Sequence, residues 1–162
     1  MRLLPLAATA LAAASLSGCM TMSRSSAVTP LDAGVASNAR VSEIRLTTGE
    51  GVQARSEFQG IFRQRVQAKL DGCADGARPL RLEATIERLD RANPVQVAIV
   101  GGANVLRGTA RLIDPATGRT VGEYAIGQTI VGSRLSIFQM SESEEQLSDA
   151  FGAELCKQAF ED

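Results

Sequence analysis

Alternation of apolar and polar residues is the feature that most limits the folds open to this chain. The clearest run is residues 80–87, where Leu, Leu, Ala and Ile alternate with charged or polar residues. Because successive side chains of a strand point to opposite faces, this pattern predicts a strand with one buried and one wet face. Residues 41–48 and 106–112 alternate in the same way. Residues 119–128, which carry Val121, Tyr124 and Ile126, are predicted to return as a fourth strand.

Two further segments carry apolar residues at helical spacing. They predict amphipathic helices over residues 54–71 and 141–160, because the apolar residues recur every three or four positions. In the second helix, Glu144 and Glu145 are expected to complement the positive end of the helix dipole. The apolar residues are Phe58, Ile61, Phe62, Val66 and Leu70 in the first helix, and Leu147, Phe151, Leu155 and Ala159 in the second.

The predicted order of elements is strand, helix, three strands, helix. A helical crossover pairs the first two strands in parallel, and Asp114-Pro115-Ala116-Thr117-Gly118 predicts a hairpin turn between the last two. Both helices have one apolar face, so both are expected to cover the same face of the sheet. Residues 41–162 are therefore predicted to form an α+β two-layer sandwich, with a four-stranded mixed sheet and two helices on one face.

Composition excludes several classes of protein. With 44% hydrophobic and 22% charged residues, the chain is neither disordered nor fibrous. Its 17 basic and 18 acidic residues provide no basic face for nucleic acid. It has no histidine, which removes the commonest general base and metal ligand. We therefore expect a protein that is not an enzyme and holds neither a metal nor a cofactor.

The first residues have the design of an export signal. Arg2 precedes an uncharged apolar run, residues 3–14, that is too short to span a bilayer as a helix of about 20 residues. Residues 1–18 are therefore predicted to be a signal peptide. An ordinary secretory signal with an accidental cysteine remains the alternative.

A four-residue motif at the end of this signal, Leu16-Ser17-Gly18-Cys19, resembles the lipobox of bacterial lipoproteins. The resemblance implies a diacylglyceryl group on the Cys19 sulfur, cleavage before this residue, and an acylated amino terminus. Multiple acyl chains hold a protein stably on a membrane. Met20 stands where members of that family retained in the inner membrane tend to have Asp. The implied location is therefore the periplasmic face of the outer membrane.

Residues 19–40 have the composition of a flexible tether. They are rich in Ser, Ala, Thr and Gly and show no apolar periodicity. A flexible spacer of this length would let the folded domain stand about 25 Å from the lipid surface.

Two cysteines remain after Cys19. An even number in an oxidising compartment predicts a disulfide between Cys73 and Cys156. The predicted topology makes the two helices parallel and places both cysteines at the same end. A redox pair or a metal site is the alternative, but the chain has no Cys-x-x-Cys motif and no histidine.

Two apolar segments, residues 94–102 and 131–140, are candidate contact surfaces for a partner, since exposed apolar patches mark interaction sites. The alternative is that their side chains belong to the core. The candidate contact residues are Val97, Ile99, Val100, Leu135 and Phe138.

The segment from Asn93-Pro94 to Gly101-Gly102, followed by residues 114–119, is similar to uncharacterised bacterial lipoprotein families with domains of unknown function. The resemblance implies an accessory role in the cell envelope. We expect a membrane-anchored periplasmic lipoprotein that binds, scaffolds or assembles an envelope protein partner. The alternative is a carrier of lipid or glycan, which would need a concave apolar cavity between sheet and helices.

Overall fold

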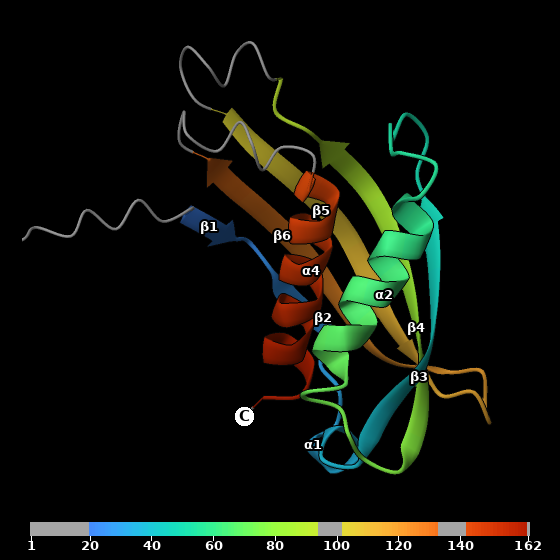
Figure 1. Cartoon of the computed structure of the whole chain (residues 1–162). Coiled ribbons are helices and arrows are strands. Elements are labelled where there is room, and N and C mark those ends of the chain that lie inside the picture. The colour runs from blue at the N-terminus through green and yellow to red at the C-terminus, as the bar shows by residue number, and fades with distance from the viewer. Residues whose placement is uncertain (1–19, 94–101, 133–141, 162) are drawn as a thin grey trace, which may run out of the picture.

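The computed structural model describes residues 20–93, 102–132 and 142–161 (Figure 1). A mixed β-sheet forms one layer, and two long helices form the other. The elements are β1 (Met20–Ser23), β2 (Ser26–Thr29), α1 (Ala33–Ala36), β3 (Ala39–Thr48), α2 (Phe58–Leu70), β4 (Arg78–Asp90), β5 (Gly102–Ile113), β6 (Thr120–Gly132) and α4 (Ser143–Ala159).

The sheet has six strands in the order β1-β6-β5-β4-β3, with β2 also pairing with β6. Strands β3 and β4 are parallel, and the other pairs are antiparallel. The α+β class, the mixed sheet and the four predicted strands are confirmed as β3 to β6. The predicted four-stranded sheet with two helices was too small, because β1, β2 and the short α1 also belong to the described fold.

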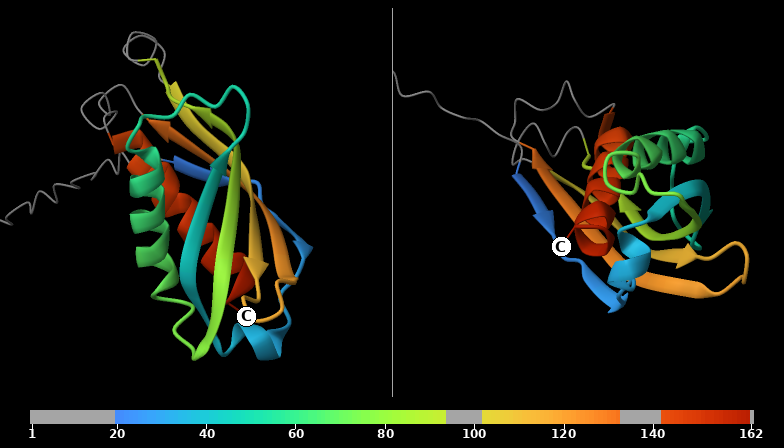
Figure 2. Two further views of the ribbon diagram at one scale, coloured as in Figure 1. Left: turned by 90° about the vertical axis from the view of Figure 1, so that its right-hand side faces the viewer. Right: turned by 90° about the horizontal axis from the view of Figure 1, so that it is seen from below.

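The prediction of a flexible tether over residues 19–40 is wrong for the part that the structure describes. Strands β1 and β2 lie along β6 (Figure 2), although every residue in both strands is exposed. Backbone hydrogen bonds to β6 hold them in place, and such bonds leave no apolar pattern in the sequence. After β2, the Leu31 N–H donates to the buried Tyr124 hydroxyl at 2.8 Å. Burial raises the pKa of this tyrosine.

The core lies between the sheet and the helices α2 and α4, which run side by side on one face (Figures 1 and 2). The rings of Phe62 and Phe151 meet edge to face, with centroids 5.1 Å apart. A Cβ atom at Gly152 would lie 2.9 Å from the Lys69 Cβ, so glycine permits this close approach of the helices. The largest fully buried side chains are Tyr124, Phe58, Phe62, Phe151, Leu70, Leu80, Leu82, Ile86, Leu106, Leu112, Ile126 and Leu147.

The predicted hairpin turn is confirmed between β5 and β6, where Gly118 has a φ of 69°. The predicted start of the first helix is wrong, because α2 begins at Phe58 instead of residue 54. Residues 49–57 instead form a loop that leads from the end of β3 to α2.

The structure contains the predicted disulfide. Cys73 follows α2 directly, and Cys156 lies in the last turns of α4. The bond joins residues separated by 83 positions, and the Cα atoms of the two cysteines are 5.8 Å apart. It therefore ties the C-terminal ends of the two covering helices together.

Replacement of both cysteines, Cys73→Ser with Cys156→Ser, is expected to lower the free energy of unfolding. A closed loop of this length contributes up to about 4.5 kcal/mol in the chain-entropy model, and measured losses often fall nearer 2–4 kcal/mol. Urea unfolding followed by circular dichroism measures the loss. Reduction of the unaltered protein should produce a similar destabilisation, and equal stability of the oxidised, reduced and doubly substituted proteins would contradict this role.

Candidate functional site

Strand β3 forms one edge of the sheet, and its first half is covered. Arg40 makes an isolated bridge with Asp75 from the loop between α2 and β4. The Gln67 side-chain amide of α2 donates to the Val41 carbonyl at 3.0 Å. Unpaired edge groups invite pairing with another chain, so these contacts protect the start of the edge.

The second half of β3 has no such cover among the described residues. Just past its end, the Gly49 N–H donates to the Ile86 carbonyl of β4 at 2.8 Å. The direction of backbone groups alternates along a strand, so those of Leu46 and Thr48 point away from β4. Within the described chain, no hydrogen bond from a turn, a loop or a side chain reaches these outward groups. A row of backbone donors and acceptors is therefore open at this edge.

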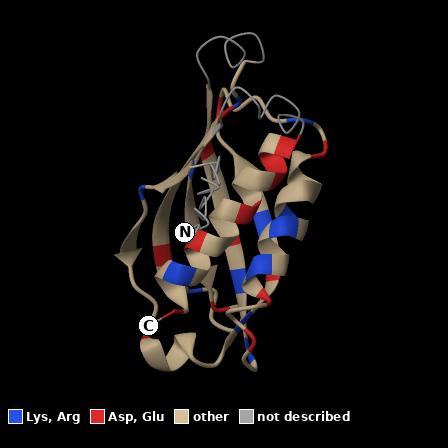
Figure 3. Cartoon of the chain, turned by 60° about the vertical axis from the view of Figure 1, so that its left-hand side comes forward, with Lys and Arg blue, Asp and Glu red and all other residues tan. Residues whose placement is uncertain are grey.

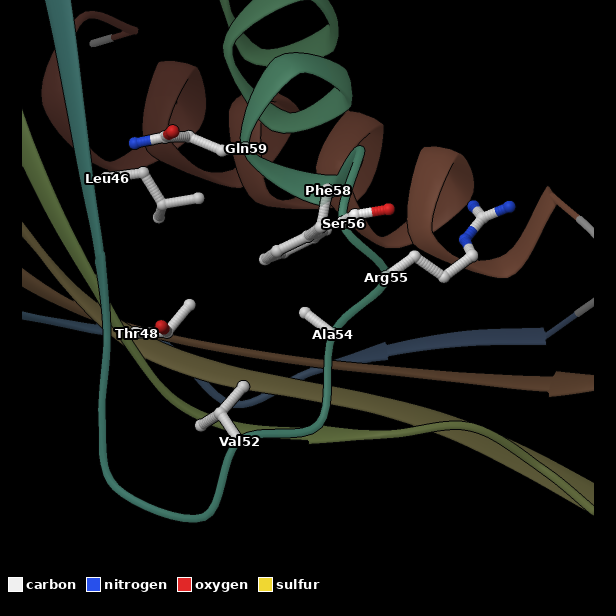
Figure 4. Close-up of a pocket in the computed structure, with 8 residues that line it drawn as sticks. All are labelled: Leu46, Thr48, Val52, Ala54, Arg55, Ser56, Phe58 and Gln59. Carbon is white, nitrogen blue, oxygen red and sulfur yellow. The ribbon is translucent and has the colours of Figure 1, made fainter.

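A cleft of about 330 Å³ lies beside this open edge, between β3, the loop 49–57 and the start of α2. Five side chains point toward one another across it (Figure 4): Leu46, Thr48, Val52, Ala54 and Phe58. The Phe58 ring is buried, whereas the other apolar walls are half-buried. The cleft thus combines an apolar interior with the unpaired backbone of a strand.

The loop wall is held by an ion pair between half-buried Arg55 and a buried carboxylate. The Arg55 guanidinium donates to Glu144 at 2.8 Å and to Glu145 at 3.0 Å, and the Arg55 N–H donates to Glu144 at 3.1 Å. The Glu144 side chain is fully buried and also lies 3.6 Å from Arg91. Its hydrogen bond raises the pKa of Arg55. The start of α4 therefore holds the loop that leads into α2.

The interpretation of Glu144 as a helix-dipole group was incomplete. It lies three residues before Leu147, on the buried side of α4, and its partner is 89 residues away. An acidic residue on the apolar face of a predicted helix was the signal available in the sequence. Nothing in the sequence identifies Arg55 as its partner, since that contact depends on the packing of two distant helix starts.

Several predicted site residues lie outside the part of the chain that the structure describes. They are Cys19, Val97, Ile99, Val100, Leu135 and Phe138. Their predicted roles in lipid attachment and partner contact stay predictions. Cys73 and Cys156 form the disulfide described above, at a distance in the fold from the cleft, because they lie at the opposite ends of α2 and α4 from Phe58 and Glu144.

Residues 20–93, 102–132 and 142–161 contain no group of three or more acidic or cysteine side chains placed to hold a metal ion. Within the same ranges, no helix is both long and apolar enough to cross a membrane. In Figure 3, the charged residues of α2 are basic, whereas those of α4 are mostly acidic.

Comparison with known proteins finds similarity at the level of the fold. No protein-family model and no curated protein matches the sequence. A Xanthomonas campestris protein of the DUF330 family has a similar structure, with a TM-score of 0.54 and 13% identity, covering 80% of this chain and 87% of that one. The PelC dodecamer from Paraburkholderia phytofirmans gives a TM-score of 0.48 at 17% identity, covering 86% and 99%. The similarity to the Xanthomonas campestris protein is one of fold.

Replacing Arg55 with alanine is expected to lower the free energy of unfolding by about 1–3 kcal/mol, because it removes charge-assisted hydrogen bonds from a buried carboxylate. The Arg65→Ala variant is the matched control. Arg65 pairs with Asp149 at 3.6 Å on the surface, and loss of an exposed pair costs at most about 1 kcal/mol. Equal urea denaturation midpoints for the two variants would contradict the assigned role of Arg55.

Proposed function

We propose that the protein is a lipid-anchored periplasmic lipoprotein of the outer membrane that binds a protein partner of the cell envelope and is not an enzyme. The partner adds an extended segment to the open edge of β3. The juxtaposition of that edge with the apolar cleft carries the proposal.

Edge pairing explains why both features occur together. An added strand gains affinity from main-chain hydrogen bonds and specificity from pockets that accept alternate side chains. The outward backbone groups of Leu46 and Thr48 supply the main-chain hydrogen bonds. The cleft lined by Val52, Ala54 and Phe58 supplies a pocket for a side chain of the partner. A partner segment lying along β3 would therefore place one apolar side chain between the strand and α2.

The filled core favours a binding role over the alternative of a lipid or glycan carrier. A carrier needs a concave apolar cavity between sheet and helices. In the described chain, Phe58, Phe62 and Phe151 occupy that space and are at most 1% exposed. The cleft at β3 is an open surface feature and is too small to enclose a lipid.

The lipid anchor is supported by the sequence. The motif Leu16-Ser17-Gly18-Cys19 ends an apolar run of signal-peptide length, and the lipobox resemblance implies acylation of the cysteine. The disulfide between Cys73 and Cys156 is compatible with export to an oxidising compartment.

The anchor is tested by labelling cells with radioactive palmitate. The unaltered protein should carry label and fractionate with the outer membrane, because acyl chains hold it there. The Cys19→Ser variant should be unlabelled and leave the membrane fraction. An unlabelled parent protein, or a Cys19→Ser variant that fractionates in the same way as the parent, would refute the anchor.

Partner binding is tested by placing a photo-crosslinking amino acid at Gln59, an exposed residue beside the cleft. Irradiation of intact cells should join it to one reproducible envelope protein, identified by mass spectrometry. The matched control carries the crosslinker at Ala116, which is exposed in the turn between β5 and β6.

Adding Thr48→Pro to the Gln59 crosslinking variant should abolish that product. Proline removes an outward N–H from the edge and leaves the ladder with β4 intact. Unchanged crosslinking in a folded Thr48→Pro protein would exclude edge pairing. Copurified lipid without a protein crosslink would favour the carrier instead.

A further inference from the structure

The sheet has an apolar corner on the face opposite the helices, where β1, β6 and β5 meet. Met20 pairs with Val131, which pairs with Ala103 on its other side. Directly opposed residues project from the same face of a sheet. The exposed fractions of Met20, Met22 and Val131 are 66%, 47% and 39%, so three large apolar side chains face outward here.

Arginine side chains border this corner. Arg107 and Arg88 are opposite each other on β5 and β4, one step along the same face from the row of Met22. Arg24 follows β1 directly, and its N–H donates to the Gly127 carbonyl at 2.8 Å. All three arginines are exposed. Arg88 forms an ion pair with Asp90. Within the described chain, neither Arg24 nor Arg107 forms an ion pair, so both guanidinium groups are available to external anions.

The corner is also fixed close to the predicted lipid. Met20 directly follows Cys19 in the sequence, and consecutive Cα atoms are about 3.8 Å apart. Two further residues of strand reach Met22, adding about 7 Å. The polar layer on each side of a bilayer is about 5–8 Å thick, the difference between the hydrocarbon core and the whole bilayer. An acyl-anchored Cys19 would therefore hold Met20 within the headgroup layer. Met22, about 11 Å along the chain from Cys19, reaches the same layer when β1 lies along the membrane surface.

We propose that this corner docks on the bilayer surface, with Met20, Met22 and Val131 in the interfacial layer and Arg24 and Arg107 on lipid phosphates. This inference rests on the proposed acylation of Cys19. The apolar side chains lie nearest the anchor and the cationic groups lie one row away, the arrangement that lets arginine reach phosphate while apolar atoms leave water.

A single tryptophan reports the docking, because the chain contains none. The Met22→Trp variant is purified with its lipid and reconstituted into vesicles of phosphatidylethanolamine and phosphatidylglycerol. Its emission should shift to shorter wavelength, and brominated phospholipid should quench it. The control is Thr47→Trp on β3, at the opposite edge of the sheet, where the residue is exposed. The emission of this control should neither shift on reconstitution into vesicles nor be quenched by brominated phospholipid.

The outcomes separate the docking from the anchor. The mass of the purified protein reports acylation independently of fluorescence. An unacylated mass refutes the proposed anchor and the docking with it. An acylated protein whose tryptophan at position 22 is neither shifted nor quenched refutes the docking alone. In the Cys19→Ser form without vesicles, a shift that grows with protein concentration would assign the corner to a second copy and also overturn the inference.

Discussion

Burial of one sheet face beneath α2 and α4 is the interaction on which the other features of the fold depend. Each phenylalanine enclosed between the layers contributes about 1.5–3 kcal/mol through removal of its ring from water. Close contact at Gly152 and the edge-to-face packing of Phe62 on Phe151 fix the two helices side by side. Because the helices are parallel, one pair of ends is joined by the disulfide and the other by the Arg55–Glu144 ion pair.

The two ends of the helix pair are held by different chemistry. The disulfide is covalent and lies away from the cleft. The ion pair lies at the cleft, and its buried carboxylate needs Arg55 to offset the cost of desolvation. The loop 49–57 is thereby positioned by a noncovalent contact that reaches across most of the sequence. The shape of the cleft and the stability of the start of α4 are consequently linked.

The sequence predicted the elements whose side chains are partitioned between core and water. Alternation around Leu82 and helical spacing around Phe62 and Phe151 identified β4, α2 and α4, because burial of one face imposes those periods. Parity of the cysteines and the parallel helices identified the disulfide. Each of these predictions rests on a local pattern or on a topological consequence of such patterns.

The missed features depend on interactions that leave no such pattern. β1 and β2 are exposed along their whole length and exist because the edge of β6 offers backbone partners. The cleft arises where the loop 49–57 and Phe58 meet β3. The sequence pattern did not predict it, since residues 54–57 were expected to be helical. Pairing of Arg55 with Glu144 follows from tertiary packing, so neither residue type nor spacing reveals it.

The position of β1 fixes the distance between the N-terminal edge of the sheet and the open edge at β3. It occupies the edge of the sheet opposite β3, with three strands between them. Adjacent strands are about 4.8 Å apart, so the two edges are separated by about 19 Å. The acyl group proposed for Cys19 would lie one residue before β1. The sheet would then act as a rigid spacer, and a partner strand bound at β3 would be held at a set distance from the anchor, which a flexible tether would not provide.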